Sequence, residues 1–180
     1  MHSFASFPIK MLKFDKEVVF MSRLDNKKEI ISLASQLHEI WRKPRLKEDG
    51  TYEPRWKKIR KDIKFIESAV NSDTLRVTKE GVEVDIANTS FIDLPFDYQE
   101  ENLLAAEVVV NILKGKKCLT AKEIEELSDI VHEEWLKRNT WAKGGELDVP
   151  YKELPEVEKA KDRVQVLAGI EMLEIPTKKR

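Results

Sequence analysis

The strongest constraint on the fold is a short motif that the chain contains twice. His38-Glu39-Ile40-Trp41 and His132-Glu133-Glu134-Trp135 repeat the same spacing of two rare residue types, in a chain with 3 histidines and 4 tryptophans. A second match follows each motif in the same order, Asp93-Leu94-Pro95-Phe96 against Asp148-Val149-Pro150-Tyr151. The sequence therefore predicts two divergent copies of a helix–loop–helix unit. The copies should pack together about a pseudo-two-fold axis, because one such unit cannot bury its apolar face alone.

Helical periodicity surrounds both motifs. Apolar residues recur at spacings of three and four in a helix from Asp25 to about Arg42, and in another helix that the capping box of Thr120 and Glu123 begins. A third helix is predicted from Asp97, at capping-box spacing from Glu100, and a fourth from Pro155 to about Met172. The apolar face expected for this last helix consists of Val157, Ala160, Val164 and Leu167.

The first copy carries a long insertion between its two helices. Residues 55–70 place apolar side chains at alternating steps of three and four, which predicts an amphipathic helix whose first part is strongly basic. Residues 74–86 alternate apolar and polar side chains around a turn at Gly81, which is typical of a β-hairpin. The predicted fold is therefore mainly α, with a small β-hairpin and a basic helix inserted in the first repeat.

The chain divides into three predicted parts. Residues 1–20 form an N-terminal extension, either disordered or an added strand, because charged residues interrupt their apolar pattern. Residues 21–115 form the first repeat with its insertion, and residues 116–176 form the second. The chain lacks an apolar run of about 20 residues, and its only cysteine is Cys118. We expect a cytoplasmic protein without membrane partners or a disulfide within the chain.

The second copy contains a characteristic series of motifs: His132-Glu133-Glu134-Trp135, Trp141, Val149-Pro150-Tyr151, Leu154 to Lys159 and Asp162-Arg163. In these motifs the second copy resembles the ryanodine-receptor (RyR) repeat domain over residues 121–173. The first copy is similar at His38-Glu39-Ile40-Trp41 and, loosely, around Pro95-Phe96.

This resemblance implies a helical fold without catalytic machinery. The family occurs in calcium-release channels and in small stand-alone proteins of bacteria and phages. In some members the paired repeats accommodate an adenine nucleotide or a related ligand between aromatic residues. For this chain the resemblance implies non-enzymatic binding of a nucleotide-derived signal, of the cyclic-nucleotide or ADP-ribose type. Such a protein would act as a sensor or as a sponge that sequesters the signal, for instance in phage counter-defence.

The candidate binding residues follow from the paired motifs. His and Trp at this spacing share one helical face, and Trp41 and Trp135 could sandwich a purine if the two copies face each other. Such residues are more often core, so a purely structural role remains the alternative. The full set of candidate ligand-binding residues is Trp41, Trp135, Trp141, His38, His132, Tyr151, Arg163, Arg55, Lys57 and Arg60.

Catalytic and metal-dependent functions find little support. His38-Glu39 and His132-Glu133 begin like a zinc-protease motif, but neither is followed by the second histidine that this motif requires. We therefore expect no cofactor and no metal. Two other functions stay open, a helical protein-interaction module without ligand and a small enzyme acting on a nucleotide signal. Homo-oligomerisation also stays open.

The charge distribution favours a compact anionic ligand over a long nucleic acid. The formal net charge is only -1, which disfavours binding to a polyanion. Residues 42–64, however, hold 10 basic against 4 acidic residues, and residues 80–107 hold 8 acidic and no basic ones. A locally basic segment therefore adjoins Trp41, although a solvated amphipathic surface would show the same pattern.

Overall fold

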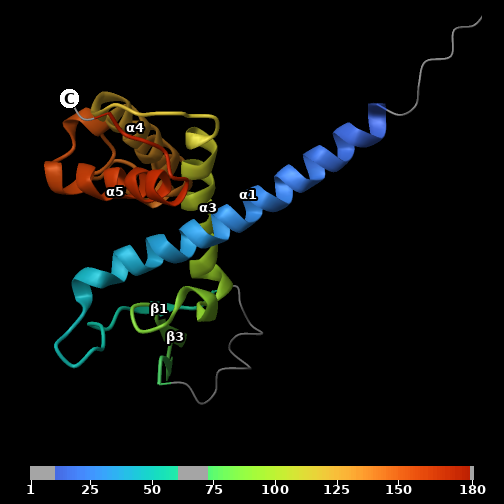
Figure 1. Ribbon diagram of the computed structural model, residues 1–180. Coiled ribbons are helices and arrows are strands. Elements are labelled where there is room, and N and C mark those ends of the chain that lie inside the picture. Colours follow the sequence, from blue (N-terminus) through green and yellow to red (C-terminus); the bar gives the residue numbers. More distant parts are fainter. Residues whose placement is uncertain (1–10, 61–72, 179–180) are drawn as a thin grey trace, which may run out of the picture.

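The computed structural model describes residues 11–60 and 73–178, with side chains from residue 26 onward. Its long helices are α1 (Met11–Arg42), α3 (Phe96–Leu113), α4 (Ala121–Arg138) and α5 (Glu156–Met172). Its strands are β1 (Trp56–Lys58), β2 (Leu75–Thr78) and β3 (Gly81–Asp85). Helix α1 packs across α3, with the α4–α5 pair on one side of the crossing and the strands on the other (Figure 1). The expected mainly α fold is thus confirmed.

Helix α1 is longer than the sequence pattern predicts. It begins at Met11 rather than after Asp25, so residues 11–20 are helical and form no added strand. The reason lies in the backbone, because neither glycine nor proline occurs between Met11 and Arg42 to interrupt a helix. Residues 1–10, the rest of the predicted extension, lie outside the described residues.

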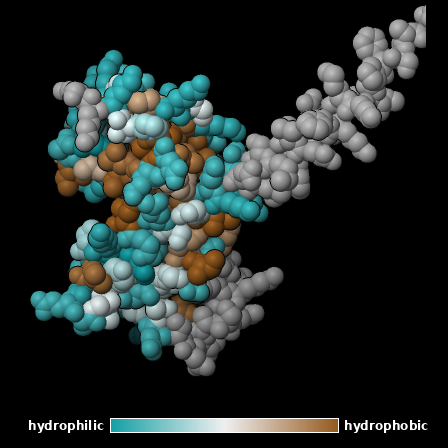
Figure 2. All heavy atoms as spheres, viewed as in Figure 1, coloured by the Kyte–Doolittle hydropathy of each residue, from teal (hydrophilic) through white to brown (hydrophobic). Residues whose placement is uncertain are grey.

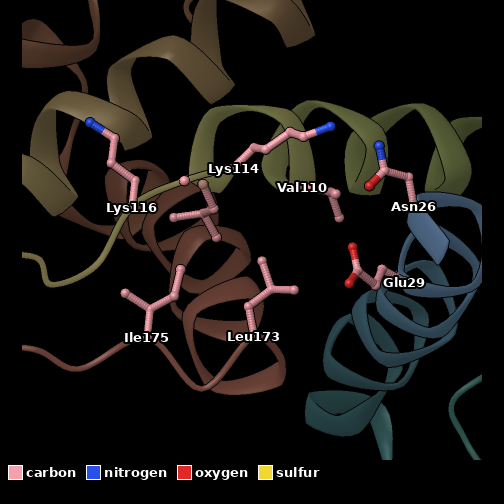
Figure 3. A pocket seen from close by; sticks show the side chains of 9 residues that line it. Asn26, Glu29, Val110, Lys114, Lys116, Leu173 and Ile175 are labelled. Atoms are coloured by element: carbon pink, nitrogen blue, oxygen red, sulfur yellow. The ribbon is translucent and has the colours of Figure 1, made fainter. Parts of the chain in front are cut away.

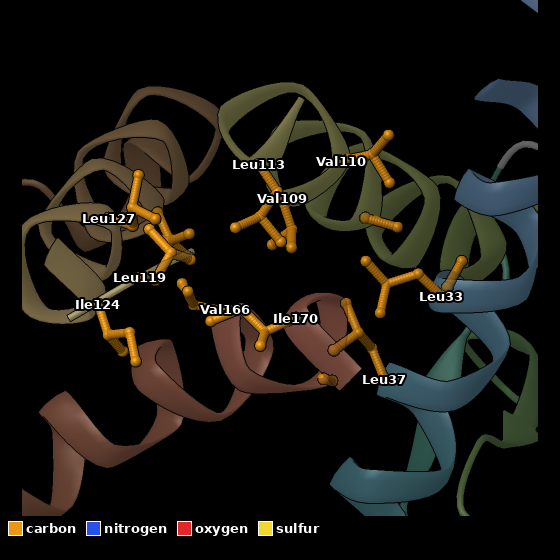
Figure 4. Packing of buried hydrophobic residues seen from close by; sticks show 14 of the residues in the cluster. Leu33, Leu37, Val109, Val110, Leu113, Leu119, Ile124, Leu127, Val166 and Ile170 are labelled. Carbon is orange, nitrogen blue, oxygen red and sulfur yellow. The ribbon is translucent and has the colours of Figure 1, made fainter. Parts of the chain in front are cut away.

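One hydrophobic core joins all four long helices. Figure 4 shows Leu33 and Leu37 of α1, Val109 and Leu113 of α3, and side chains of α4 and α5 meeting in this core. Gly169 of α5 allows the closest approach, since a Cβ there would overlap the side chains of Val109 and Leu113. The core therefore holds α5 directly against α3.

A three-stranded antiparallel sheet in the order β1-β3-β2 replaces part of the expected helical insertion. The predicted hairpin is confirmed as β2 and β3, which turn at Gly81 with φ of 127°. The predicted basic helix is wrong at its start, because Trp56 to Lys58 pair with β3 as a strand. The residues 61–72 of that prediction lie outside the described residues.

Backbone hydrogen bonds explain why this segment is a strand. Ile59 donates its backbone N–H to the Val82 carbonyl at 2.9 Å, and Ile86 donates to the Arg55 carbonyl at 3.0 Å. These partners come from a hairpin distant in sequence, so the local helical periodicity could not reveal them. Propensity patterns are weak priors that tertiary contacts override.

The helix starts confirm one predicted cap and correct two. Thr120 and Glu123 form the expected capping box at the start of α4. Helix α3 begins one residue before Asp97, behind Pro95, and the Asp97 carboxylate instead accepts the backbone N–H of Arg60 at 2.8 Å. Helix α5 likewise begins at Glu156, behind Pro155 rather than with it. Helices α3 and α5 therefore both start directly after a proline.

The buried face of α5 differs from the predicted apolar stripe. Val157 is 67% exposed and Leu167 is 42% exposed, whereas Asp162, Val166, Gly169 and Ile170 are buried. The buried face therefore lies at other residues than expected, and it includes Asp162, which contacts a histidine of α4. A buried carboxylate cannot be recognised by counting apolar residues.

The surface is mixed in polarity. Figure 2 shows hydrophobic side chains among the hydrophilic ones on the face that it presents. Of the helices in the described ranges, not one has the length and apolarity needed to span a membrane.

Candidate functional site

The first predicted pair, His38 and Trp41, lies at the C-terminal end of α1. The two rings are stacked, with centroids 5.7 Å apart and an interplanar angle of 21°. His38 is 2% exposed, and its Nε2 lies 2.9 Å from the carbonyl oxygen of Thr89. Because a carbonyl only accepts, Nε2 carries the proton and donates it to Thr89.

The second predicted pair, His132 and Trp135, repeats this arrangement at the end of α4. Its ring centroids are 6.3 Å apart with an interplanar angle of 16°, and His132 is 3% exposed. His132 donates from Nε2 to the carbonyl oxygen of Val149, 3.0 Å away. Each histidine therefore ties the end of its helix to the loop that leads into the next long helix.

The chain that follows each bonded carbonyl also runs in parallel. Beyond Thr89 comes a 3-10 turn at Phe91–Asp93, then Leu94-Pro95 and α3. Beyond Val149 comes a 3-10 turn at Tyr151–Glu153, then Leu154-Pro155 and α5. In this order of elements Pro95 corresponds to Pro155, which corrects the predicted correspondence of Pro95 with Pro150.

A cavity of about 170 Å³ adjoins the first pair. Leu94 and Ile86 give it apolar walls, and Glu101 and Asn102 of α3 bring a carboxylate and an amide to it. Tyr98 also lines it, and the Tyr98 hydroxyl donates to the carbonyl of Lys58 at 2.6 Å, so β1 holds this wall in place. The complete lining is His38, Trp41, Ile86, Leu94, Tyr98, Glu101 and Asn102.

The protonation of His38 leaves one ring nitrogen available. Burial lowers the pKa of His38 below its ordinary value of 6.5, so the imidazole is neutral near pH 7. With the proton on Nε2, Nδ1 is an unprotonated acceptor, and no hydrogen bond to Nδ1 is found among the described residues. A deeply buried imidazole at a cavity wall thus has one unused acceptor.

In the second pair, the corresponding nitrogen, Nδ1 of His132, has a partner. Asp162 of α5 places Oδ2 3.3 Å from Nδ1 of His132, and both side chains are buried. Burial raises the pKa of Asp162 to about 6, and the neighbouring His132 opposes this shift. Beside this pair, Lys161 contacts both carboxylate oxygens of Glu158, at 2.6 and 2.7 Å.

The tryptophans take part in separate ring contacts. Trp41 has the Arg45 guanidinium 4.3 Å from its ring centroid, in a cation–π contact. Trp135 meets Trp141 edge to face, with centroids 5.6 Å apart and an interplanar angle of 87°. Ring contacts of the described residues join Trp135 to His132 and Trp141, not to Trp41. Trp41 therefore belongs to one local cluster, and Trp135 belongs to another together with Trp141.

Tyr151 and Arg163 are engaged in a polar network between α4 and α5. Arg163 forms ion pairs with Glu125 and Glu156, and Tyr151 donates its hydroxyl to Glu125 at 2.9 Å. The hydrogen bonds from Arg163 lower the pKa of Glu125, and burial raises the pKa of Tyr151 to about 12. Both predicted site residues are thus already paired within the protein, which leaves Arg163 without the open guanidinium expected for a phosphate contact.

Of the predicted basic residues, Lys57 lies in β1, Arg55 directly precedes this strand and Arg60 follows it by two residues. Arg55 and Arg60 are exposed and Lys57 is half-buried. The positive charge of Arg60 acts on the Tyr98 hydroxyl and opposes the rise that burial causes in the pKa of Tyr98. Arg60 therefore sits within electrostatic range of the cavity beside Trp41.

Sequence reasoning missed Tyr98, Glu101, Asn102 and Asp162. The first three occupy one face of α3, at the spacing that makes helical residues neighbours. Asn102 follows Pro95 at the same distance as Asp162 follows Pro155. This equivalence would have revealed both residues, had the two prolines been aligned with each other.

A second cavity, of about 270 Å³, lies between α1, α3 and the C-terminal segment. Asn26 and Glu29 come from α1, Lys114 from the end of α3, and Leu173 and Ile175 from the opposite wall (Figure 3). It contains no aromatic side chain and none of the predicted residues. It offers nothing on which a planar ring could stack.

Neither a metal site nor a comparison with known proteins adds to the description of the candidate site. In the described part of the chain, histidine, cysteine and carboxylate side chains form no group of three that could hold a metal ion. Comparison with protein-family models, curated proteins and solved structures finds no match for this chain.

Proposed function

We propose that this protein binds the planar ring of a nucleotide-derived small molecule, without catalysis, in the cavity beside Trp41. The chain would consist of two RyR-like copies, packed about a pseudo-two-fold axis, of which the first forms the site. The observation that carries the proposal is the stack of the buried His38 on the half-buried Trp41, at the wall of a cavity that Tyr98, Glu101 and Asn102 also line. Ligand sites are typically apolar cavities with a few convergent polar groups, as here.

The size of the cavity decides which part of the ligand it holds. Sites for drug-sized ligands have volumes of about 300–1,000 Å³, so a cavity of about 170 Å³ takes one ring system and leaves the rest outside. Stacking of a base on an aromatic side chain contributes about 1–3 kcal/mol. The Glu101 carboxylate, the Asn102 amide and Nδ1 of His38 supply hydrogen-bonding groups for the edge of the ring.

The phosphate or ribose portion would lie at the mouth of the cavity, near basic side chains. Arg45 lies against the Trp41 ring, and Arg60 acts electrostatically on Tyr98. Arginine recognises phosphate through charge-assisted, often bidentate hydrogen bonds. Arg60 and Arg45 therefore replace Arg163 as the proposed phosphate contacts.

In this proposal the protein is a sensor or a sequestering sponge for a cyclic-nucleotide or ADP-ribose-type signal. The RyR resemblance supports that biological setting, including phage counter-defence. The second pair and the Tyr151 network would be structural.

The test is a retention experiment with a panel of nucleotide signals. The purified protein is incubated with the panel, washed and denatured, and the released molecules are identified by mass spectrometry. Recovery of one intact compound supports binding, whereas recovery of a converted compound would show an enzyme. If no compound is retained by the folded protein, the proposal is wrong.

A pair of tryptophan variants tests where the molecule binds. Trp41→Leu keeps an apolar side chain but removes the stacking surface, so retention should fall by about 5- to 140-fold, since about 1.4 kcal/mol corresponds to a factor of ten. Trp141→Leu is the matched control, because Trp141 is 74% exposed and does not line the cavity. Equal losses in both variants would contradict the assignment to Trp41.

A protein-interaction function is the second candidate, and exposed apolar side chains favour it. Ile92 is 76% exposed and Phe96 is 50% exposed, and both lie at the turn that begins α3. Ile92→Ser should leave nucleotide retention unchanged. Self-association of the protein is measured separately by light scattering, and its loss in Ile92→Ser would support the interaction function.

A further inference from the structure

We infer that the second half of the chain contains a closed counterpart of the Trp41 cavity, a second site for the same class of planar ligand. The ion pairs His132–Asp162 and Glu158–Lys161 keep it shut. This inference rests on the proposed function of the first cavity, and it assigns to Asp162, Glu158 and Lys161 the role of closing the site.

Three structural features that surround the first cavity occur in both halves, and we call them the frame of the site. Each half has a stacked His–Trp pair at a helix end, a histidine Nε2 bonded to a loop carbonyl, and a Leu-Pro step before the next helix. Leu94, which lines the first cavity, corresponds to Leu154, and both leucines are buried. The two sites therefore differ in the side chains that fill the frame and not in the frame.

The decisive difference is between Asn102 and Asp162. The Asn102 amide donates to the carbonyl of Tyr98 at 2.8 Å, along its own helix, and makes no hydrogen bond to His38 in the described structure. Asp162 instead turns to Nδ1 of His132. That contact requires a proton between the two atoms, since Nε2 of His132 already donates to Val149. The acceptor that is unused on His38 is thus occupied on His132.

The remaining lining positions reinforce this difference. Tyr98 and Glu101 line the first cavity, and their counterparts are Glu158 and Lys161. Glu158 and Lys161 bond to each other, so a salt bridge takes the positions that a tyrosine ring and the Glu101 carboxylate have in the first half. Replacing the Tyr98 wall by an ion pair takes away one aromatic wall of the site, while Trp135 remains.

The test exchanges these residues and follows each tryptophan by NMR. The chain has 4 tryptophans, whose indole N–H signals can be assigned with single substitutions. Adenosine monophosphate is the probe. In the wild-type protein it should shift the Trp41 signal and leave Trp135 unchanged. In the triple variant Glu158→Tyr, Lys161→Glu, Asp162→Asn, the Trp135 signal should shift as well, with two molecules bound instead of one.

The converse variant keeps the inference falsifiable if the triple variant fails to fold. Asn102→Asp should give His38 the carboxylate partner that His132 has in the second half and abolish the Trp41 shift, whereas Asn111→Asp, at an exposed position of the same helix, should not. The closed-site inference is overturned if the Trp135 signal of a folded triple variant does not shift. It is also overturned if the Trp41 signal of Asn102→Asp shifts as it does in the wild-type protein. If adenosine monophosphate does not shift the Trp41 signal of the wild-type protein but shifts the Trp135 signal of the triple variant, the proposed function is overturned instead. If neither signal shifts in the folded proteins, the closed-site inference and the proposed function are both overturned.

Discussion

At the scale of single residues, Asn102 and Asp162 show how one side chain decides the state of a buried histidine. The two side chains have nearly the same shape, but the Asp162 carboxylate contacts Nδ1 of its histidine, whereas the Asn102 amide donates to the carbonyl of Tyr98 on its own helix. The result is a paired His132 and a half-paired His38, each 2–3% exposed. His38 and Asp162 are both expected to contribute to the pH dependence of stability, with opposite signs.

The Asp162 carboxyl should make the protein less stable as pH rises. Its pKa is raised from 3.8 to about 6 in the folded protein, so the folded state binds a proton that the unfolded chain has released. Its contribution is complete below pH 3.8 and lost as pH rises toward 6. Urea unfolding of wild type and Asp162→Asn across this range should show wild type losing on the order of 1 kcal/mol relative to the variant, after allowing for solvent screening. Asp129→Asn, which removes an exposed carboxylate of α4, should run parallel to wild type.

His38 should act in the other direction. Its pKa is lowered from 6.5 by burial, so the unfolded chain takes up a proton below pH 6.5 that the folded protein refuses. Stability is therefore complete above this pH and falls as the solution becomes more acidic. His38→Gln can still donate to Thr89 but does not titrate, so its unfolding free energy should depend less on pH between about 5 and 7. A variant with the same pH dependence as wild type would show that His38 titrates normally in the folded state.

At the scale of elements, the helices were predictable and the strand β1 was not. The capping box of Thr120 and Glu123 and the apolar spacing of α4 lie within one stretch of sequence, and both are confirmed. Trp56 and Ile59 fit a helix equally well, but hydrogen bonds from a distant hairpin make a strand of their segment. Local patterns cannot report a partner that lies elsewhere in the chain.

The same reason limits what the sequence revealed about the candidate site. The repeated motif pointed to His38 and Trp41, and both line the cavity. Glu101 and Asn102 are polar residues within a helix, a type that usually faces solvent, so nothing in the local pattern marked them. Asp162 was marked only by the family resemblance, and not as a site residue. Arg163 was expected to be open, but its partner Glu125 comes from α4 and its partner Glu156 from the first turn of α5.

The contact between α3 and α5 yields a prediction for Gly169. A methyl group at this position would overlap Val109 and Leu113 in the core, so Gly169→Ala should lower the unfolding free energy by about 1–3 kcal/mol, although alanine favours helix. Ala160→Ser, at an exposed position of the same helix, should change it by less than about 0.5 kcal/mol. Thermal and urea denaturation of the three proteins would measure this. A stabilised Gly169→Ala would mean that α5 is not held this closely against α3.

At the scale of the whole molecule, a net charge of -1 conceals an uneven distribution. Arg45, from the basic residues 42–60, lies against Trp41 of the first cavity, and Glu101 of α3 lines the same cavity. Such an arrangement attracts a compact phosphorylated molecule to one rim but repels a long polyanion that would also cover the acidic side. The ligand should therefore gain affinity from a small number of local ion pairs.

This arrangement predicts how salt affects binding. An exposed ion pair contributes about 0.2–1 kcal/mol, and the Debye length shrinks from about 10 Å at 0.1 M salt to about 3 Å at 1 M. Raising the salt concentration through this range should weaken binding of adenosine monophosphate by up to about fivefold, and should leave adenosine, which has no phosphate, nearly unaffected. Arg60→Gln should remove much of the salt dependence, whereas Arg76→Gln, whose charge is paired with Glu83 at 2.6 Å, should not. Titration calorimetry would measure both compounds against both variants. A salt dependence as steep as that of nucleic-acid binding proteins would instead indicate that many cations act together, and the local rim would no longer account for binding.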